Sequence, residues 1–367
     1  MSRKKSEDRP NIWDIQVDNM IENYSWYWWW WIFFIDDPDN PGRPKQLMIL
    51  WSTKCTDHIK VMDKEWSLEN FPKWEENRLE LEGMVAAWWY DGEDMEDPLF
   101  LEETDILVEK DDEGGSLKTD IENCEYSLSG NPEKYTVKIK DSDNDFTFEL
   151  TPSNSYLSKH RPNEERYTDD YGYNIMKIHG MNLDGRIDGK EVEGTAYFQR
   201  VCVDAPAVPW YWGVFHGEDG SFLQYFDLFV GPQMFRSKDT QRSMLEWGDI
   251  SVSRSVIFYH RETDKEYRFN KESIEIEKEL KKGLPIFTVK GKEDGNKISI
   301  RSRAYSRAFW RFQQKRRFGM KQVLYYNEYP AEVLDFSFES VEDSLKLEKE
   351  DIGRMYGNFE HTWGKLF

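Results

Sequence analysis

Apolar and polar residues alternate along much of this chain. In the segment YTVKIK, Tyr135, Val137 and Ile139 occupy every second position, and after the polar turn DSDND the segment FTFEL repeats the pattern. A period of two places successive side chains on opposite faces of a strand. These two segments therefore predict a hairpin of two strands that share one apolar face.

The same pattern recurs further along the chain. Residues 256–269 and 286–302 each contain two alternating segments joined by a polar turn with Asp and Glu, and the second turn also has Gly. A last alternating segment covers 333–341. Residues 274–282 (IEIEKELKK) alternate at first and then become charged, so they remain ambiguous. Many short strands joined by regular polar turns predict an all-β sandwich or barrel.

The segment WYWWWWIFF, residues 26–34, places eight aromatic rings in nine positions. A Pro- and Gly-rich stretch follows, and then the apolar segment QLMILWS, which indicates two adjacent strands around a loop. Because the rings lie on both faces, both faces of the first strand need to be covered. The rings can form a core, line a ligand cavity or contact a membrane, and the core is the expected role for most of them.

Composition narrows the range of partners. The 367 residues are enough for two domains, and 70 acidic against 49 basic residues give a net charge of −21. Such a charge repels phosphate backbones, so we expect no nucleic-acid partner. The three cysteines are far apart, the N-terminus has no apolar signal segment, and the longest apolar run is too short to cross a bilayer. We therefore predict a cytoplasmic protein without stable membrane insertion.

One basic segment runs against the acidic composition. Residues 301–317 carry seven cations and no acid, interleaved with aromatic residues. This pattern fits a nucleic-acid patch or interaction surface. It also fits a solvated strand face whose partners are the surrounding acids, which is the interpretation we favour.

Common catalytic motifs are absent from the sequence. It contains no G-x-S-x-G, no P-loop, no H-E-x-x-H and no dinucleotide-binding G-x-G-x-x-G after a strand. The acidic segment 109–115 lacks the ligand spacing of a calcium loop. We therefore expect neither a metal ion nor a cofactor.

A more specific pattern occurs at 182–226, which reads NLDGRIDGKEVEGTAYFQRVCVDAPAVPWYWGVFHGEDGSFLQYF. This arrangement of G-x-I-x-G, V-x-G-x-A-Y and Trp-x-Trp resembles the two-domain lipocalin-like family of carotenoid hydratases, AttH-like proteins and fungal Diels–Alderases. The aromatic first strand and the closing segment GRMYGNFEHTWG fit the same outline. The resemblance implies two lipocalin-like antiparallel β-barrels packed side by side, with an aromatic ligand cavity. We expect the domains to cover residues 1–235, which contain the cavity, and 236–367.

The resemblance also implies a type of chemistry. Some members are acid–base enzymes that act on terpenoid or polyketide substrates, and others have no established activity. Tyr197 and Phe198 match the aromatic pair of the family, but Gln199 stands where many members have an aspartate. If that aspartate donates the proton in alkene hydration, this chain lacks it at that position.

Acid–base chemistry on an alkene needs a protonated acid and a nearby base, and a dry aromatic site favours both the neutral acid and a cationic intermediate. The candidates for these roles are His216, Asp227 and Glu360. Each has a structural alternative: His216 lies beside a turn and suits the surface, Asp227 needs a partner if it is buried, and Glu360 alternates with His361, so at most one of the two faces inward. The candidates for ligand binding are Trp29, Trp31, Tyr173, Tyr197, Gln199, Trp210, Trp212, Tyr225, Tyr356 and Trp363.

Two functions follow from these residues. The first is a cofactor-free enzyme, a hydratase, isomerase or cyclase, that acts on a hydrophobic isoprenoid-like molecule in an aromatic cavity. The second is a carrier that binds a similar hydrophobic ligand without chemistry. A buried carboxylate or histidine that faces the ligand favours the enzyme, whereas a site of rings and hydroxyls alone favours the carrier.

Overall fold

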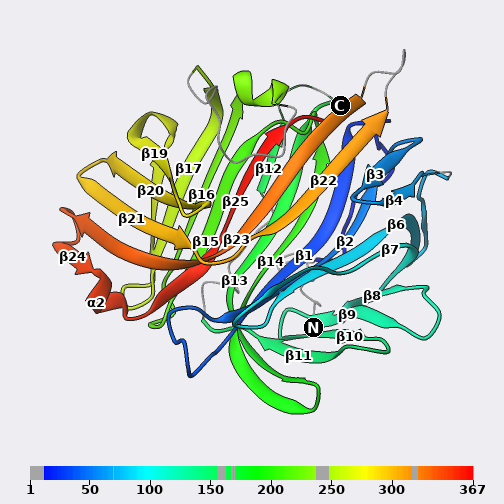
Figure 1. Cartoon of the computed structure of the whole chain (residues 1–367), viewed down its shortest axis with the longest axis horizontal. Coiled ribbons are helices and arrows are strands. Elements are labelled where there is room, and N and C mark those ends of the chain that lie inside the picture. Colours follow the sequence, from blue (N-terminus) through cyan, green and yellow to red (C-terminus); the bar gives the residue numbers. More distant parts are fainter. Residues whose placement is uncertain are drawn as a thin grey trace, which may run out of the picture.

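The computed structural model describes residues 12–68, 70–154, 163–166, 168, 170–236, 248–315 and 321–366. Two antiparallel sheets lie side by side (Figure 1). The first sheet closes into a ten-stranded barrel, because the strand Asp145–Thr151 at one end of the ladder pairs with the strand Gly172–Ile187 near the other end. Its barrel strands are β1 (Ser25–Ile35), β2 (Lys45–Lys54), β6 (Arg78–Tyr90), β7 (Met95–Lys110), β8 (Gly115–Thr119), β9 (Glu125–Asn131), β10 (Lys134–Lys140), β11 (Asp145–Thr151), β13 (Gly172–Ile187) and β14 (Lys190–Asp204), with β5 (Trp74–Glu75) and β12 (Asn163–Arg166) at the margins.

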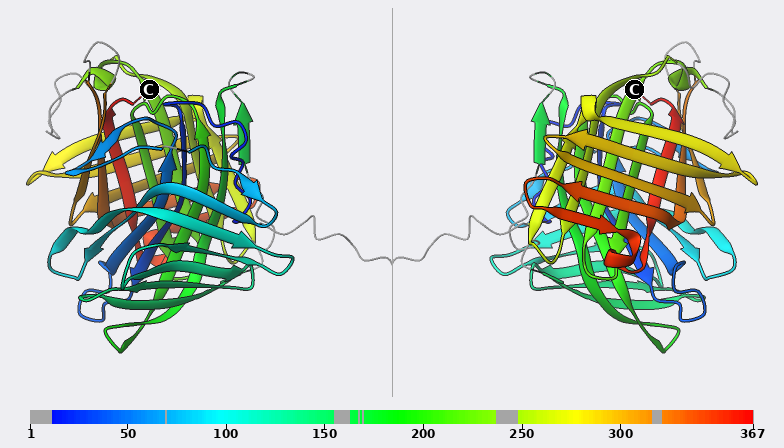
Figure 2. Two further views of the ribbon diagram at one scale, coloured as in Figure 1. Left: turned by 90° about the vertical axis from the view of Figure 1, so that its right-hand side faces the viewer. Right: turned by 90° about the vertical axis from the view of Figure 1, so that its left-hand side faces the viewer.

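The second sheet curls around a core of its own, and Figure 2 shows its strands crossing those of the first barrel. The protein therefore has the all-β, two-barrel architecture that the alternating pattern and the resemblance predict. Its elements are β15 (Trp210–Gly217), β16 (Phe222–Val230), η1 (Pro232–Phe235), β17 (Ile250–His260), β18 (Lys265–Asn270), η2 (Lys271–Ser273), β19 (Ile274–Lys281), β20 (Leu284–Glu293), β21 (Asn296–Ala304), β22 (Ala308–Lys315), β23 (Lys321–Ser340), β24 (Leu345–Glu348), α2 (Lys349–Ile352) and β25 (Met355–Gly364).

The predicted hairpins are present. Tyr135, Val137 and Ile139 of β10 pair with Leu150, Phe148 and Phe146 of β11, and all six side chains are buried. The ambiguous segment 274–282 forms strand β19, in which only its first residue is fully buried. In the part of the chain that the structure describes, no helix is long and apolar enough to span a membrane.

The chain leaves the first sheet earlier than predicted. Strand β14 ends at Asp204, and β15 already pairs with β25 of the second sheet. A short hairpin of the N-terminal half, β3 (Ile59–Val61) and β4 (Lys64–Trp66), also joins the second sheet by pairing with β22. Sheet membership therefore changes at residues 205–209, and β15 and β16 of the predicted segment 1–235 are strands of the second sheet.

Strand β1 is buried on both faces, as the density of its rings requires. Trp29, Trp31 and Phe33 point into the first barrel, where they contact other rings such as Phe148 and Phe198 at centroid distances of 4.6 Å. The alternate rings, Trp28, Trp30 and Phe34, point outward to the second sheet. The alternation predicted from the sequence is therefore present.

Gly194 explains part of the motif at 182–226. A Cβ atom at this position of β14 would lie 2.0 Å from the carbonyl oxygen of Phe34 in β1. Only glycine allows the two backbones to approach this closely. The preceding Asp188–Gly189 turn has positive φ at both residues, which is the conformation that a tight Asp-Gly hairpin requires.

The three cysteines are free thiols, and Cys55 and Cys202 are buried. In the basic segment 301–317, Arg301 pairs with Glu279 and Arg303 pairs with Glu332. These two arginines have acidic partners, as the structural interpretation expects, and the last two arginines of the segment lie outside the described residues.

Candidate active site

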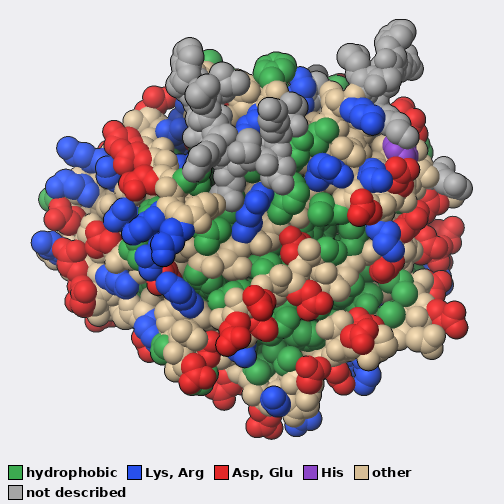
Figure 3. All heavy atoms as spheres, viewed as in Figure 1, with side chains coloured by type: hydrophobic (Ala, Val, Ile, Leu, Met, Phe, Trp, Pro, Cys, Tyr) green, Lys and Arg blue, Asp and Glu red, His purple; other side chains and the backbone are tan. Residues whose placement is uncertain are grey.

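The two barrels meet through a layer of buried side chains, which we call the interface layer. The first barrel contributes rings on β1, β6 and β14, and the second sheet contributes rings on β15, β22 and β25. Trp30 lies at its centre, with its ring 5.4 Å from that of Trp212 and 5.7 Å from that of Tyr197. Apolar side chains also gather in the middle of the face shown in Figure 3, surrounded by charged groups of both signs.

Two glutamates lie in this layer. Glu328 of β23 and Glu360 of β25 are directly opposite each other in the antiparallel ladder, so their side chains share one face. They are 1% and 4% exposed. Burial of two carboxyl groups is costly without compensation, so their contacts decide what the pair can do.

Tyr326 lies between the two carboxyl groups. Its hydroxyl is 2.8 Å from Oε1 of Glu360 and is also within hydrogen-bond distance of Oε1 of Glu328. The remaining oxygens accept hydrogen bonds from indole groups, Glu360 from Trp210 at 2.5 Å and Glu328 from Trp88 at 3.0 Å. We call Glu328, Tyr326 and Glu360 the carboxyl cluster.

The hydrogen-bond count of the carboxyl cluster requires an extra proton. A tyrosine hydroxyl has one proton, so it can donate to only one of the two carboxylates. The other carboxyl group must donate to the hydroxyl oxygen, and one of the two glutamates is therefore protonated when both contacts are made. The cluster thus holds an acid and a base within reach of one hydroxyl.

The pKa values agree with this count. Desolvation raises the pKa of Glu328 well above its ordinary value, and the charge of Glu360 raises it further. Desolvation raises the pKa of Glu360 to about 7, although the hydrogen bonds from Trp210 and Tyr326 act in the opposite direction. Glu328 is therefore the acid at rest and Glu360 the group that titrates near neutral pH.

A third carboxyl group lies at the edge of the layer. Asp97 of β7 accepts hydrogen bonds from the backbone N–H of Phe309 and from the indole of Trp310, both on β22. Desolvation raises its pKa to about 6. Like the Trp88–Glu328 contact, this contact joins the first barrel to the second sheet.

His216 is buried, contrary to its expected surface position. Its Nδ1 lies 2.8 Å from the hydroxyl of Thr195 on β14, and its ring packs against Phe34 in the interface layer. Desolvation lowers its pKa to about 3, so the imidazole is neutral near pH 7. The turn after His216 is exposed, but the strand before the turn lies between the two barrels. The neighbouring turn residues therefore led to the wrong prediction of a surface position for His216.

Asp227 has the partner that its burial requires. It is 1% exposed, faces the interior of the second sheet and forms an ion pair of 2.8 Å with Arg254, while Ser251 donates a second hydrogen bond. Arg254 also donates to the carbonyl of Ile274 and so connects β17 to β19. This geometry is that of a structural ion pair.

Glu360 and His361 point to opposite faces of β25, as predicted. Glu360 faces the interface layer, and His361 faces the interior of the second sheet, where its Nε2 lies 3.0 Å from Oε1 of Gln233. Both side chains are buried, because both faces of β25 are covered.

The predicted site residues fall into three groups. Trp29 and Trp31 are in the interior of the first barrel, packed among other rings, and Tyr173 is half-buried on β13. The interior of the second sheet holds Asp227, Tyr225 and Trp363. The interface side brings together His216, Glu360, Tyr197, Gln199, Trp210, Trp212 and Tyr356.

Sequence reasoning missed Tyr326, Glu328, Trp88 and Asp97. One signal could have indicated Glu328: it is a single acid inside the apolar segment 323–331, where a buried charge needs a specific partner. Its position opposite Glu360 depends on a long-range register that no local pattern encodes.

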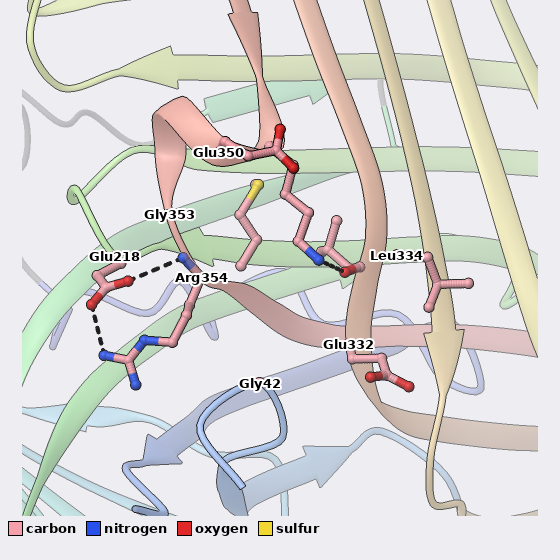
Figure 4. Close-up of a pocket in the computed structure, with 10 residues that line it drawn as sticks. Gly42, Glu218, Glu332, Leu334, Glu350, Gly353 and Arg354 are labelled. Carbon is pink, nitrogen blue, oxygen red and sulfur yellow. Dashed lines mark hydrogen bonds and ion pairs between the residues drawn. The ribbon is translucent and has the colours of Figure 1, made fainter.

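A separate hollow of about 490 Å³ lies between the start of β25, α2 and the loop before β2 (Figure 4). Several of its charged residues have partners: Glu218 pairs with Arg354 at 2.8 Å, Glu332 pairs with Arg43 and Arg303, and Lys349 donates to the carbonyl of Val333. It does not include the carboxyl cluster. Among the described residues, no group of three or more His, Cys, Asp and Glu side chains could hold a metal ion.

The fold and the interface layer define an all-β protein of two antiparallel barrels with a buried carboxyl cluster between them. No family model matches the chain, and no curated protein matches it. Among solved structures, the chain is similar to a protein of Nitrosomonas europaea assigned as an AttH, with 13% identity over 96% of both chains and a TM-score of 0.49.

Two further structures are similar to this chain. CghA, solved with Sch210972, has 8% identity over 93% of this chain and 88% of its own, with a TM-score of 0.49. Kievitone hydratase from Nectria haematococca has 8% identity over 95% and 93% of the two chains, with a TM-score of 0.45. The AttH name is the one that the sequence resemblance also gave, but likeness at this level does not assign an activity.

Proposed function

We propose that this protein is a cofactor-free acid–base enzyme, a hydratase, isomerase or cyclase, acting on a hydrophobic isoprenoid-like molecule at the interface of its two barrels. The observation that carries this proposal is the carboxyl cluster, in which Tyr326 links a protonated and an ionisable glutamate away from water. Structural carboxylates in such a place usually have a basic partner, and this pair has hydroxyl and indole donors instead.

The cluster has the two groups that alkene chemistry needs. Glu328 is the proton donor, and its acid form is maintained by desolvation and by the nearby charge of Glu360. Glu360 is the base that removes a proton or activates water. The indole rings of Trp30 and Trp212 supply faces that stabilise a cationic intermediate.

The packing supports the interface as the place of reaction. The rings of Trp29 and Trp31, expected to line a cavity, fill the interior of the first barrel with their neighbours. By contrast, Trp210 and Tyr326, which donate hydrogen bonds to Glu360, are half-buried, and so is Trp28 in the same layer. A ligand that reaches these rings also reaches Glu360.

The test is incubation with neutral prenylated phenols and acyclic isoprenoid alcohols in D2O, followed by mass spectrometry. A gain of D2O identifies a hydratase. Deuterium incorporation without added water identifies an isomerase when the number of double bonds is unchanged and a cyclase when one double bond is lost. Glu360→Gln should abolish the change, and Glu339→Gln, an exposed acid on the same strand as Glu328, should not. Binding measured by tryptophan quenching without any conversion would contradict the proposal and support a carrier.

A further inference from the structure

The carboxyl cluster has an unusual charge balance. Among the described residues, no Lys or Arg forms an ion pair with Glu328 or Glu360, and their hydrogen bonds come from Tyr326 and two indole groups. Asp97 adds a further acidic group on the side of Glu328. The positive charge that balances this acidic site in the structure is therefore the shared proton.

A shared proton can be replaced by another cation. Ionisation of both glutamates leaves two negative charges in a desolvated layer, where attraction to a cation is stronger than in water. A quaternary ammonium group has no proton to donate, but it has low hydration and packs well against aromatic rings. Such a group gives the two carboxylates the same net charge of −1 that they have with the shared proton.

The surrounding rings suit a cation. Trp30, Trp212 and Tyr197 form a continuous set of ring contacts next to Glu360. The same layer already holds one ammonium group, because the buried Lys54 has its Nζ 5.4 Å from the ring centroid of Trp26. The interface layer is thus chemically able to accommodate an alkylammonium group beside its indoles.

Few other titratable groups face this position. They are the hydroxyls of Tyr326 and Tyr197, the carboxyl group of Asp97 and, beyond it, Arg307. The amide of Gln224 on β16, with its oxygen toward both donors, accepts from Lys177 of the first barrel at 2.8 Å and from Trp212 at 3.0 Å. The two glutamates dominate the electrostatics of the site, because Arg307 donates to Asn327 and Lys177 donates to Gln224.

We propose that the carboxyl cluster binds an organic ammonium group between Glu328 and Glu360 in place of their shared proton. This inference rests on the proposed function only because it uses the same site. It names the ligand class, which is a hydrophobic molecule with a cationic alkylated nitrogen. Binding of a quaternary ammonium ion releases one proton from the carboxyl cluster to solvent, and no covalent bond changes.

The experiment compares choline with 3,3-dimethylbutan-1-ol, its uncharged isostere, by isothermal titration calorimetry of the full chain. We expect choline to bind at least tenfold more tightly than the alcohol at pH 8. Its affinity should rise by up to tenfold per pH unit as the pH rises toward the pKa of the cluster, because cation and proton compete. Calorimetry in buffers of different ionisation enthalpy should give a release of about one proton.

Variants give effects of opposite sign. Glu328→Gln and Glu360→Gln should each reduce the preference for choline to less than threefold, whereas Tyr326→Phe, which removes the bridging hydroxyl, should increase choline affinity. Glu339→Gln makes the same exchange of side chain on the exposed surface of β23, where Glu339 pairs with Lys297, and should leave the preference unchanged. Circular dichroism establishes that each variant is folded before the titration.

Equal binding of choline and the alcohol by the wild-type protein would overturn the inference, and so would a choline preference that survives both glutamine variants. These results are independent of the deuterium experiment. Deuterium incorporation into neutral alkenes without choline preference overturns the ammonium inference alone. Choline preference without any conversion of neutral alkenes supports it and contradicts only the proposed reaction.

Discussion

The two faces of strand β1 show how differently one strand can be used. Its inward face carries Trp29, Trp31 and Phe33 into the first barrel, where most neighbours are apolar and Arg200 lies opposite Trp29. Its outward face carries Trp28 and Trp30 into the interface layer, where the opposite wall contains Glu328, Glu360 and Tyr326. The inward face stabilises the barrel, and the outward face borders the polar groups that are suited to chemistry.

This difference has a physical origin. Side chains inside the first barrel mostly meet rings and aliphatic groups, and the buried Arg200 there donates to the neutral side chain of Asn174. The interface layer is formed by two sheets that each have a core of their own, and each supplies polar groups to the other: Trp88 to Glu328, and Trp310 to Asp97. A polar site can therefore be completed there without disrupting either core.

The largest expected effect concerns the outward side. Glu328→Gln and Glu360→Gln should each lower kcat at least about 100-fold for any substrate that the protein converts, because each removes one member of an acid–base pair. Steady-state kinetics of the two variants beside Glu339→Gln measures this. A 100-fold loss that appears only in KM would indicate that the glutamates bind substrate without transferring a proton.

Substitutions on the inward face of β1 should lower the free energy of unfolding. Trp31→Ala removes a fully buried ring from the first barrel and should lower the free energy of unfolding by about 3–5 kcal/mol. Trp28→Ala, on the half-buried outward face, should cost less than half of this and should weaken ligand binding. Urea unfolding and tryptophan quenching separate the two effects, and equal effects of both variants on both measurements would contradict the division between the faces.

The pH dependence of stability distinguishes the groups in the interface layer. The pKa of Glu360 is raised from 4.5 to about 7 on folding, so its protonated form stabilises the fold fully below pH 4.5. This contribution is lost as the pH rises to 7 and amounts to about 3 kcal/mol. Urea unfolding between pH 4.5 and 8 should show this loss in wild type and a smaller one in Glu360→Gln.

His216 acts with the opposite sign. Its pKa falls from 6.5 to about 3 on folding, so the stability that its neutral form provides is present above pH 6.5 and is lost as the pH falls toward 3. The difference between wild type and Glu360→Gln cancels this term, since His216 is present in both proteins. The free energy of unfolding of wild type minus that of Glu360→Gln should fall as the pH rises to 7. A difference that instead rises with pH would contradict the assignment to Glu360.

The sequence predicted the architecture better than the site. Alternation at 135–150 and 286–302 gave correct strands and faces because a period of two depends only on local geometry. The same rule placed Glu360 and His361 on opposite faces. It could not show that Glu328 lies opposite Glu360 or that Trp88 reaches across to it, because both depend on strand register and on the docking of two sheets.

The smallest effect tests whether the site could lie inside the second barrel instead. Asp227, a candidate from the sequence, is held by Arg254 and Ser251 on the inner face of the second sheet. Asp227→Asn keeps the shape and one acceptor but loses the charge, and because Arg254 remains partly exposed we expect a loss of only about 1–2 kcal/mol. Conversion of substrate and choline preference should stay unchanged in the folded variant, since the ion pair lies on the other face of the sheet from the carboxyl cluster. A loss of kcat as large as that of Glu360→Gln would move the reacting groups into the second barrel, and β16 would then replace the interface layer as the catalytic surface.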